Sequence, residues 1–153
     1  MKNRVIVSEE DFDLEKFRDK MIGDDSTPVV IFTEPVQKEK DGVEISEMEV
    51  IPYSSTTKNS IITIRDQVVD RFDIETVAII QRVGVLEPGE KVMAVLISAA
   101  ERDEAAEALG FCLEMFEMHI PIRKKVVTVD GKEYWIERSD DMMELYGQVA
   151  EGM

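Results

Sequence analysis

Apolar residues form short unbroken runs in some parts of the chain and recur at helical spacing in others, which predicts both strands and helices. Residues 77–80 and 92–97 are continuous aliphatic runs of strand length, typical of covered central strands. Between them, Glu87, Pro88, Gly89 and Glu90 place Pro and Gly where a type II turn requires them. We therefore predict a hairpin over residues 77–97.

A helix is predicted directly after this hairpin. Ser98 stands at an N-cap position and Glu101 follows three residues later, which is the pattern of a capping box. The helix would run from residue 99 to about 118, with an apolar face of Ala105, Leu109, Cys112, Leu113 and Phe116. Arg102 falls within that face, so its guanidinium needs a nearby acid, another chain or an anionic ligand. Cys112 lies on the same face and is interpreted as inert packing.

The first third of the chain predicts a small helix followed by strands. Residues 11–21 carry Phe12, Phe17 and Met21 among charges, a pattern typical of a short helix that covers a sheet. Residues 28–33 are expected to form a buried strand, and residues 34–42 a mobile polar loop. Beyond the loop, the apolar positions change parity, which predicts a bulge near Ser46 or Glu47.

Two more segments have clear patterns. From Ser54 onward, Ile61, Ile64, Val68 and Phe72 recur on one face of a predicted helix whose start hydroxyl residues can cap. Pro121 ends the later helix, and residues 122–129 form a strand that returns to residue 136 through a type I′ turn at Asp130 and Gly131. Residues 139–153 indicate a weak amphipathic helix or a loose tail.

Charge narrows the list of partners. The 153 residues fit one domain, and 18 basic against 33 acidic residues give a net charge of −15, which argues against nucleic acid and anionic membranes as partners. One cysteine excludes an internal disulfide, and no signal peptide or membrane span is evident, so we expect a cytoplasmic protein. His119 has no second histidine, so no metal site is expected. Arg123, Lys124 and Lys125 form a basic triplet, which fits either an anion site or an edge strand protected by lysine.

The order of these features resembles a known family. Residues 29–138 contain, in order, the pattern I-x-R-x-G-x-L-x-P-G-E, an apolar strand, Ser98-Ala99 with Arg102, a helix, P-x-x-K and G-x-x-x-W. This order is similar to that of the large, catalytic subunit of molybdopterin synthase, also called molybdopterin converting factor subunit 2. The resemblance implies an α+β fold of the hammerhead type, with helices packed on an antiparallel or mixed sheet. It also implies a homodimer that moves sulfur from the thiocarboxylated tail of a ubiquitin-like small subunit to cyclic pyranopterin monophosphate, without metal or cofactor.

Several polar positions of that family differ in this chain. The resemblance keeps Arg82, Arg102 and Lys124, whereas two family histidines correspond to Gln81 and Glu101. The family's tryptophan before the kept lysine corresponds to Arg123, and the arginine of its mobile loop to Gln37. The family's catalytic lysine corresponds to Glu117, which reverses the charge and implies little or no sulfur transfer.

These differences leave two main hypotheses for function. In the first, Lys124 or Lys125 replaces the missing amine, while Arg102, Arg82, Arg123 and Lys38 bind the phosphate. Lys38 and Lys40 could supply the charge lost at Gln37, but their pattern favours ordinary solvated lysines. In the second, the chain is a catalytically impaired relative that binds the carrier or a pterin phosphate without turnover; an unrelated acidic interaction domain is the third. Arg102 and Glu117 would lie about 22 Å apart on one helix, which predicts a site shared between two chains.

Overall fold

Two sheets and three helices make up the α+β fold of the computed structural model, which describes residues 3–22 and 27–136. The α+β class predicted from the sequence is confirmed. The prediction of a helix or tail over residues 139–153 lies outside the described residues. None of the described helices is both long enough and apolar enough to span a membrane.

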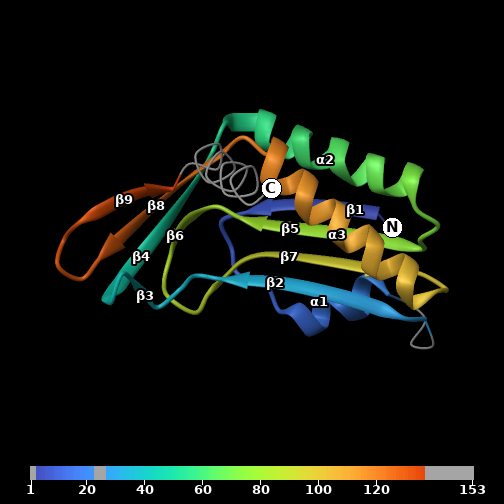
Figure 1. Cartoon of the computed structure of the whole chain (residues 1–153), viewed down its shortest axis with the longest axis horizontal. Helices are drawn as coiled ribbons and strands as arrows, with labels where there is room; N and C mark the ends of the chain where they lie inside the picture. Colours follow the sequence, from blue (N-terminus) through green and yellow to red (C-terminus); the bar gives the residue numbers. More distant parts are fainter. Residues whose placement is uncertain (1–2, 23–26, 137–153) are drawn as a thin grey trace, which may run out of the picture.

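The first sheet contains the predicted hairpin at its centre. Its strand order is β1 (Asn3–Ser8), β5 (Thr76–Arg82), β7 (Lys91–Ser98) and β2 (Val29–Pro35), with β1 parallel to β5 and the other pairs antiparallel (Figure 1). Gly89 has a φ of +90°, and the Glu90 N–H donates to the Glu87 carbonyl at 3.0 Å, as the predicted turn requires. Strands β5 and β7 are almost entirely buried. The prediction that β2 is buried is wrong, because β2 is an edge strand and Ile31 is 39% exposed.

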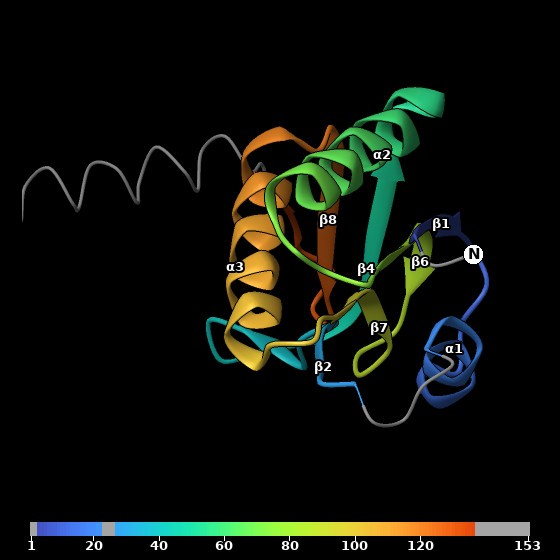
Figure 2. The ribbon, with the colours of Figure 1, turned by 90° about the vertical axis from the view of Figure 1, so that its right-hand side faces the viewer.

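Helices cover both faces of this sheet. The helices α2 (Ser54–Arg71) and α3 (Arg102–His119) lie on one face, and α1 (Leu14–Met21) lies on the other (Figure 2). Residues on the predicted face of α2 are buried, with Ile61 and Val68 both at 0% exposure. Phe17 and Met21 of α1 pack in one cluster with Ala78, Ile80 and Leu96 of the sheet, so the predicted covering helix is confirmed.

The second sheet is built around one long strand. β4 (Val43–Pro52) pairs with β3 (Glu39–Lys40), β6 (Gly84–Leu86) and β8 (Ile122–Thr128), and β8 pairs with β9 (Glu133–Ile136). The ladder between β4 and β8 shifts register between Ile45 and Glu47, which confirms the predicted bulge. Most of the segment 34–42 is exposed, as expected for the predicted polar loop, but Val36 is 1% exposed and β3 pairs with β4.

The predicted capping box does not form. Ser98 is the last residue of β7 and is paired on both sides, with Val29 of β2 and Thr76 of β5. Its carbonyl accepts from the Glu75 N–H at 2.8 Å. Pairing across the sheet therefore outweighs the local capping pattern, and α3 begins only at Arg102, with Glu101 as an N-cap that makes no side-chain capping bond.

Two other local predictions need correction. The β8–β9 turn is not type I′, because Gly131 has a positive φ while Asp130 does not, and the Gly131 N–H donates to the Thr128 carbonyl. The Thr128 hydroxyl and the Asp130 carboxylate hold this turn together. At the start of α2 the N-cap is Tyr53, which makes no side-chain capping bond, and the Thr57 hydroxyl accepts from the Tyr53 N–H instead.

Candidate active site

A cavity of about 300 Å³ opens where the two sheets meet the C-terminal end of α3. Its apolar wall includes Met48, Met93, Phe116, Ile120, Ile122 and Val126. Its polar lining consists of Glu34, Gln37, Lys40, Gln81, Glu117 and Lys124. Mostly apolar walls with a few convergent polar groups are typical of sites for small molecules.

Strand β8 divides the basic triplet between its two faces. Lys124 faces the cavity, and its Nζ lies 3.9 Å from Glu34 Oε2. Lys125 points to the other face, where its Nζ lies 3.6 Å from Glu49 and from Glu133. Arg123 stacks over the Trp135 ring on that same face, 4.1 Å from the centroid. The strand is not an edge, because β8 lies between β4 and β9, so edge protection does not explain the triplet.

Four positions that the resemblance singled out meet in this cavity. Gln37 comes from the segment between β2 and β3, and Gln81 comes from β5. Glu117 comes from the last turn of α3, and Lys124 comes from β8. Lys40 also lines the cavity and lies over the Tyr134 ring, with Nζ 5.2 Å from its centroid. Lys38 is exposed and does not line the cavity. The cavity therefore balances two carboxylates against two ammonium groups.

Arg82 lies in a separate cluster that anchors the N-terminal segment. Its side chain is 5% exposed, its Nη2 donates to the Glu9 carbonyl at 2.9 Å, and its Nη1 lies 3.5 Å from Asp11 and 3.6 Å from Glu90. Arg82 does not line the cavity. These contacts give the guanidinium a structural role, joining the start of the chain to the β6–β7 turn.

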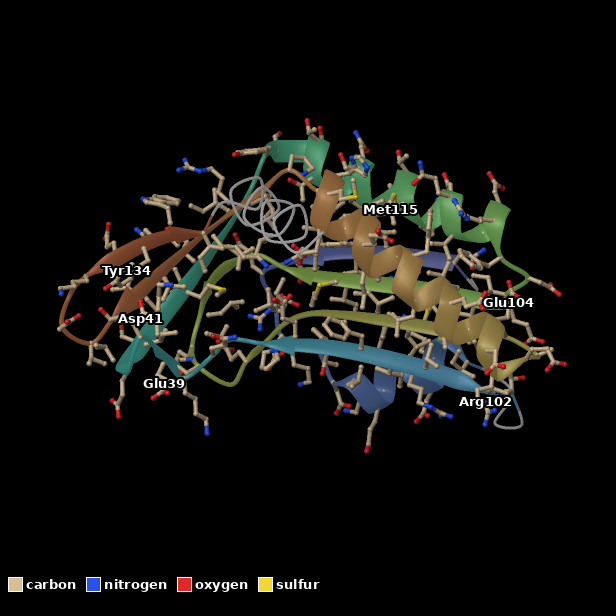
Figure 3. The ribbon with its side chains drawn as sticks, in the orientation of Figure 1. Glu39, Asp41, Arg102, Glu104, Met115 and Tyr134 are labelled. Carbon is tan, nitrogen blue, oxygen red and sulfur yellow. The ribbon has the colours of Figure 1, made fainter. Side chains whose placement is uncertain are left out.

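Arg102 lies at the far end of α3 from the cavity. The prediction that it occupies the apolar face is wrong, because its side chain is 86% exposed and its Nε lies 3.4 Å from Asp103. The buried row of α3 is Ala105, Ala108, Cys112 and Phe116, and it begins one turn later. Figure 3 shows Arg102 and Tyr134 at opposite ends of the molecule. A single chain therefore does not bring Arg102 and Lys124 together.

The sequence pattern does not predict Gln81 as a site residue. Gln81 follows five buried residues of β5, is 1% exposed and lines the cavity. A polar residue at the end of a buried run was the signal that could have identified it. Cys112 is no candidate nucleophile, because burial raises the pKa of its thiol to about 12. Within residues 3–22 and 27–136, no group of three or more His, Cys, Asp or Glu residues is arranged to hold a metal ion.

Comparison with known proteins agrees with the family resemblance of the sequence. The model of the family described as "MoaE protein" matches residues 7–117. The molybdopterin synthase catalytic subunit of Pyrococcus abyssi is 32% identical over 128 residues, which cover 84% of this chain and 86% of that protein.

Solved structures show the same architecture. Molybdopterin synthase from Staphylococcus aureus matches with a TM-score of 0.77 at 23% identity, covering 86% of this chain and 96% of that one. A chain from the complex of subunits 1 and 2 of molybdopterin-converting factor from Helicobacter pylori matches with a TM-score of 0.68 at 14% identity, covering 90% and 91%. The chain therefore belongs to the MoaE family, the family of molybdopterin synthase catalytic subunits in molybdenum cofactor biosynthesis.

Proposed function

We propose that this protein is the large subunit of a molybdopterin synthase, which accepts sulfur from a thiocarboxylated ubiquitin-like small subunit and passes it to cyclic pyranopterin monophosphate. The observation that carries this proposal is the position of Lys124, whose ammonium lines the cavity together with Gln37 and Glu117. Lys125 points away from the cavity to two carboxylates on the other face, so Lys124 is the stronger candidate of the two for the reacting amine.

The cavity has the chemistry that such a reaction needs. A carrier tail that ends in two glycines has no side chains, so it can enter a narrow cavity lined by Met48, Met93 and Phe116. Within the cavity, the Lys124 ammonium can attract the terminal thiocarboxylate or the substrate phosphate, or donate a proton. Lys40 adds a second ammonium to the cavity lining. The Helicobacter pylori complex of two subunits supports a small-subunit partner.

A second candidate function is binding without turnover. Glu117 supports it, because this residue places a carboxylate in the cavity where the resemblance implies a catalytic lysine. That carboxylate would repel both the substrate phosphate and the carboxylate that the carrier leaves behind. Such a protein would still bind the carrier or a pterin phosphate.

Single-turnover formation of the dithiolene, with purified thiocarboxylated carrier, tests the first function. We expect Lys124→Ala to lower the rate by about 10² to 10³, the usual effect of removing one positioned polar group. Lys125→Ala is the matched control, because it removes a lysine of similar exposure from the other face of the same strand. Equal losses in both variants would contradict the role of Lys124. Carrier binding by a wild-type protein that transfers no sulfur would favour the second function.

A further inference from the structure

We propose that Gln81 contacts the ligand directly, with its side-chain amide oxygen accepting a hydrogen bond from an N–H group of a bound heterocycle. Gln81 would thereby select ligands that carry a donor at their buried end. The identification of that heterocycle as a pterin rests on the proposed function. The recognition chemistry rests on the geometry of Gln81 alone.

The carboxamide of Gln81 is held in one orientation. Its Nε2 donates to the Arg82 carbonyl at 2.8 Å and to the Val92 carbonyl at 3.3 Å. Main-chain carbonyls accept and cannot donate, so the nitrogen, and not the oxygen, must face them. The amide oxygen is then the polar atom that remains for the cavity. In the part of the chain that the structure describes, these two donations are the side-chain hydrogen bonds of Gln81.

This arrangement is more than a link between two strands. Among the described residues, Arg82 Nε is the buried side-chain polar atom without a partner, and the Gln81 amide oxygen is not a second one. This oxygen therefore stays open to the cavity that Gln81 lines, where a ligand N–H can reach it. Arg82 is itself held by Glu9, Asp11 and Glu90, so the acceptor sits on a rigid support and loses little conformational entropy when a ligand binds.

Polarity changes from the mouth of the cavity to its inner end. Gln37 and Glu117 are exposed, whereas Glu34, Lys40 and Lys124 are half-buried. Gln81 is buried and uncharged, and the methionines Met48 and Met93 are buried as well. A ligand that matches this order carries its anionic group outward, toward the lysines, and a flat ring with an N–H inward. The pyrimidinone ring of a pterin has such donors.

The test compares two ligands for their affinity to wild type and to two variants, and each affinity is measured by fluorescence titration. Lumazine, a pteridine with ring N–H groups, is compared with dimethyllumazine, in which both of these groups are methylated. We expect wild type to prefer lumazine by about tenfold or more, the effect of one hydrogen bond to a buried acceptor. Gln81→Met, which keeps the length and removes the acceptor, should abolish this preference. Gln67→Met, at an exposed glutamine of α2 that does not line the cavity, is the matched control and should retain it.

The alternatives give different results. If Gln81 is only structural, Gln81→Met weakens both ligands equally and the preference survives, which overturns the proposal. If that variant does not fold, the carbon-13 shift of the Gln81 side-chain carbonyl in wild type decides the question. It should move with lumazine and stay in place with dimethyllumazine, and movement with neither overturns the proposal. Sulfur transfer without lumazine binding would overturn the role of Gln81 and leave the proposed function intact. Selective lumazine binding without sulfur transfer would overturn the proposed function and leave the role of Gln81 intact.

Discussion

Lys124 Nζ lies 3.9 Å from Glu34 Oε2, so an ion pair joins β8 of one sheet to β2 of the other at the cavity. Lys124, the lysine that faces the cavity, is therefore already paired with a carboxylate before any ligand binds. On the opposite face of β8, Lys125 Nζ lies 3.6 Å from Glu49 Oε1, and the side chains of both pairs are exposed to similar extents. Glu34 thus competes with an anionic ligand for Lys124.

Removing this competitor should improve anion binding. We expect Glu34→Gln to raise the affinity for pterin phosphate about two- to fivefold, a modest effect because Glu34 is 40% exposed and solvent screens the pair. The gain should shrink at high salt. Glu49→Gln, which removes one of the two carboxylates beside Lys125, should leave the affinity unchanged in the same titration. An equal gain in both variants would point to net charge and not to Lys124.

Charge reversal at position 117 should restore sulfur transfer if the cavity is otherwise competent. Glu117→Lys replaces the carboxylate with an amine at the end of α3, where the resemblance implies the family's catalytic group. We expect a rise of about 10² in the single-turnover rate, provided that the carrier still docks. Glu114→Lys makes the same charge change one turn earlier on α3, outside the cavity lining, and should have little effect. A wild type that already reacts as fast as this variant would argue that Lys124 suffices.

Arg102 lies far from the cavity of its own chain, so it can contribute only to the cavity of a second chain. Mixing two variants tests whether a dimer shares its sites in this way. We expect Arg102→Ala and Lys124→Ala each to lower sulfur transfer when assayed alone. Coexpression of the two should recover part of the activity, because a mixed dimer holds one site with both residues intact. Sedimentation should show a dimer in each preparation. Monomers at high concentration, or no recovery on mixing, would exclude a shared site.

The sequence predicted the helices and strands better than the contacts that each of them makes with the rest of the chain. Periodicity located β5, β7 and α2 and even the bulge after Ile45, because these depend on which residues face a core. The capping box at Ser98 failed because β2 and β5 both pair with that residue, and local pattern contains no information about partners distant in sequence. The prediction for Arg102 failed with it, because α3 begins at Arg102 and its buried row, which includes the predicted Ala105 and Cys112, begins one turn later.

The residues of the candidate site could likewise be predicted only in part from the sequence. Lys124 was identified from the sequence, but nothing local distinguished it from Lys125, because only the pairing of β8 decides which lysine faces the cavity. Lys40 lines the cavity and Lys38 does not, which follows from the small strand β3 that the sequence did not reveal. Gln81 was recognised as a departure from the family and not as part of a site.

Cys112 should make the stability of the protein depend on alkaline pH. Burial raises the pKa of its thiol from 9.0 to about 12 in the folded chain. Above pH 9 the unfolded chain loses this proton while the folded chain keeps it, so the stability from the buried neutral thiol is present below pH 9 and is lost as the pH rises through 12. The advantage of wild type over Cys112→Ala in urea unfolding should therefore shrink by about 1.4 kcal/mol per pH unit above 9. A constant difference would contradict this.

The parallel pairing of β1 with β5 has a consequence for folding while the chain is being synthesised. The partner of Asn3 is Val77, 74 residues further along the chain. At a synthesis rate of about 5 to 20 residues per second, the first strand emerges about 4 to 15 s before the strand it pairs with. During that interval the polar backbone edge of β1 and its apolar Val5 have no native partner, so β1 depends on protection until β5 has been made.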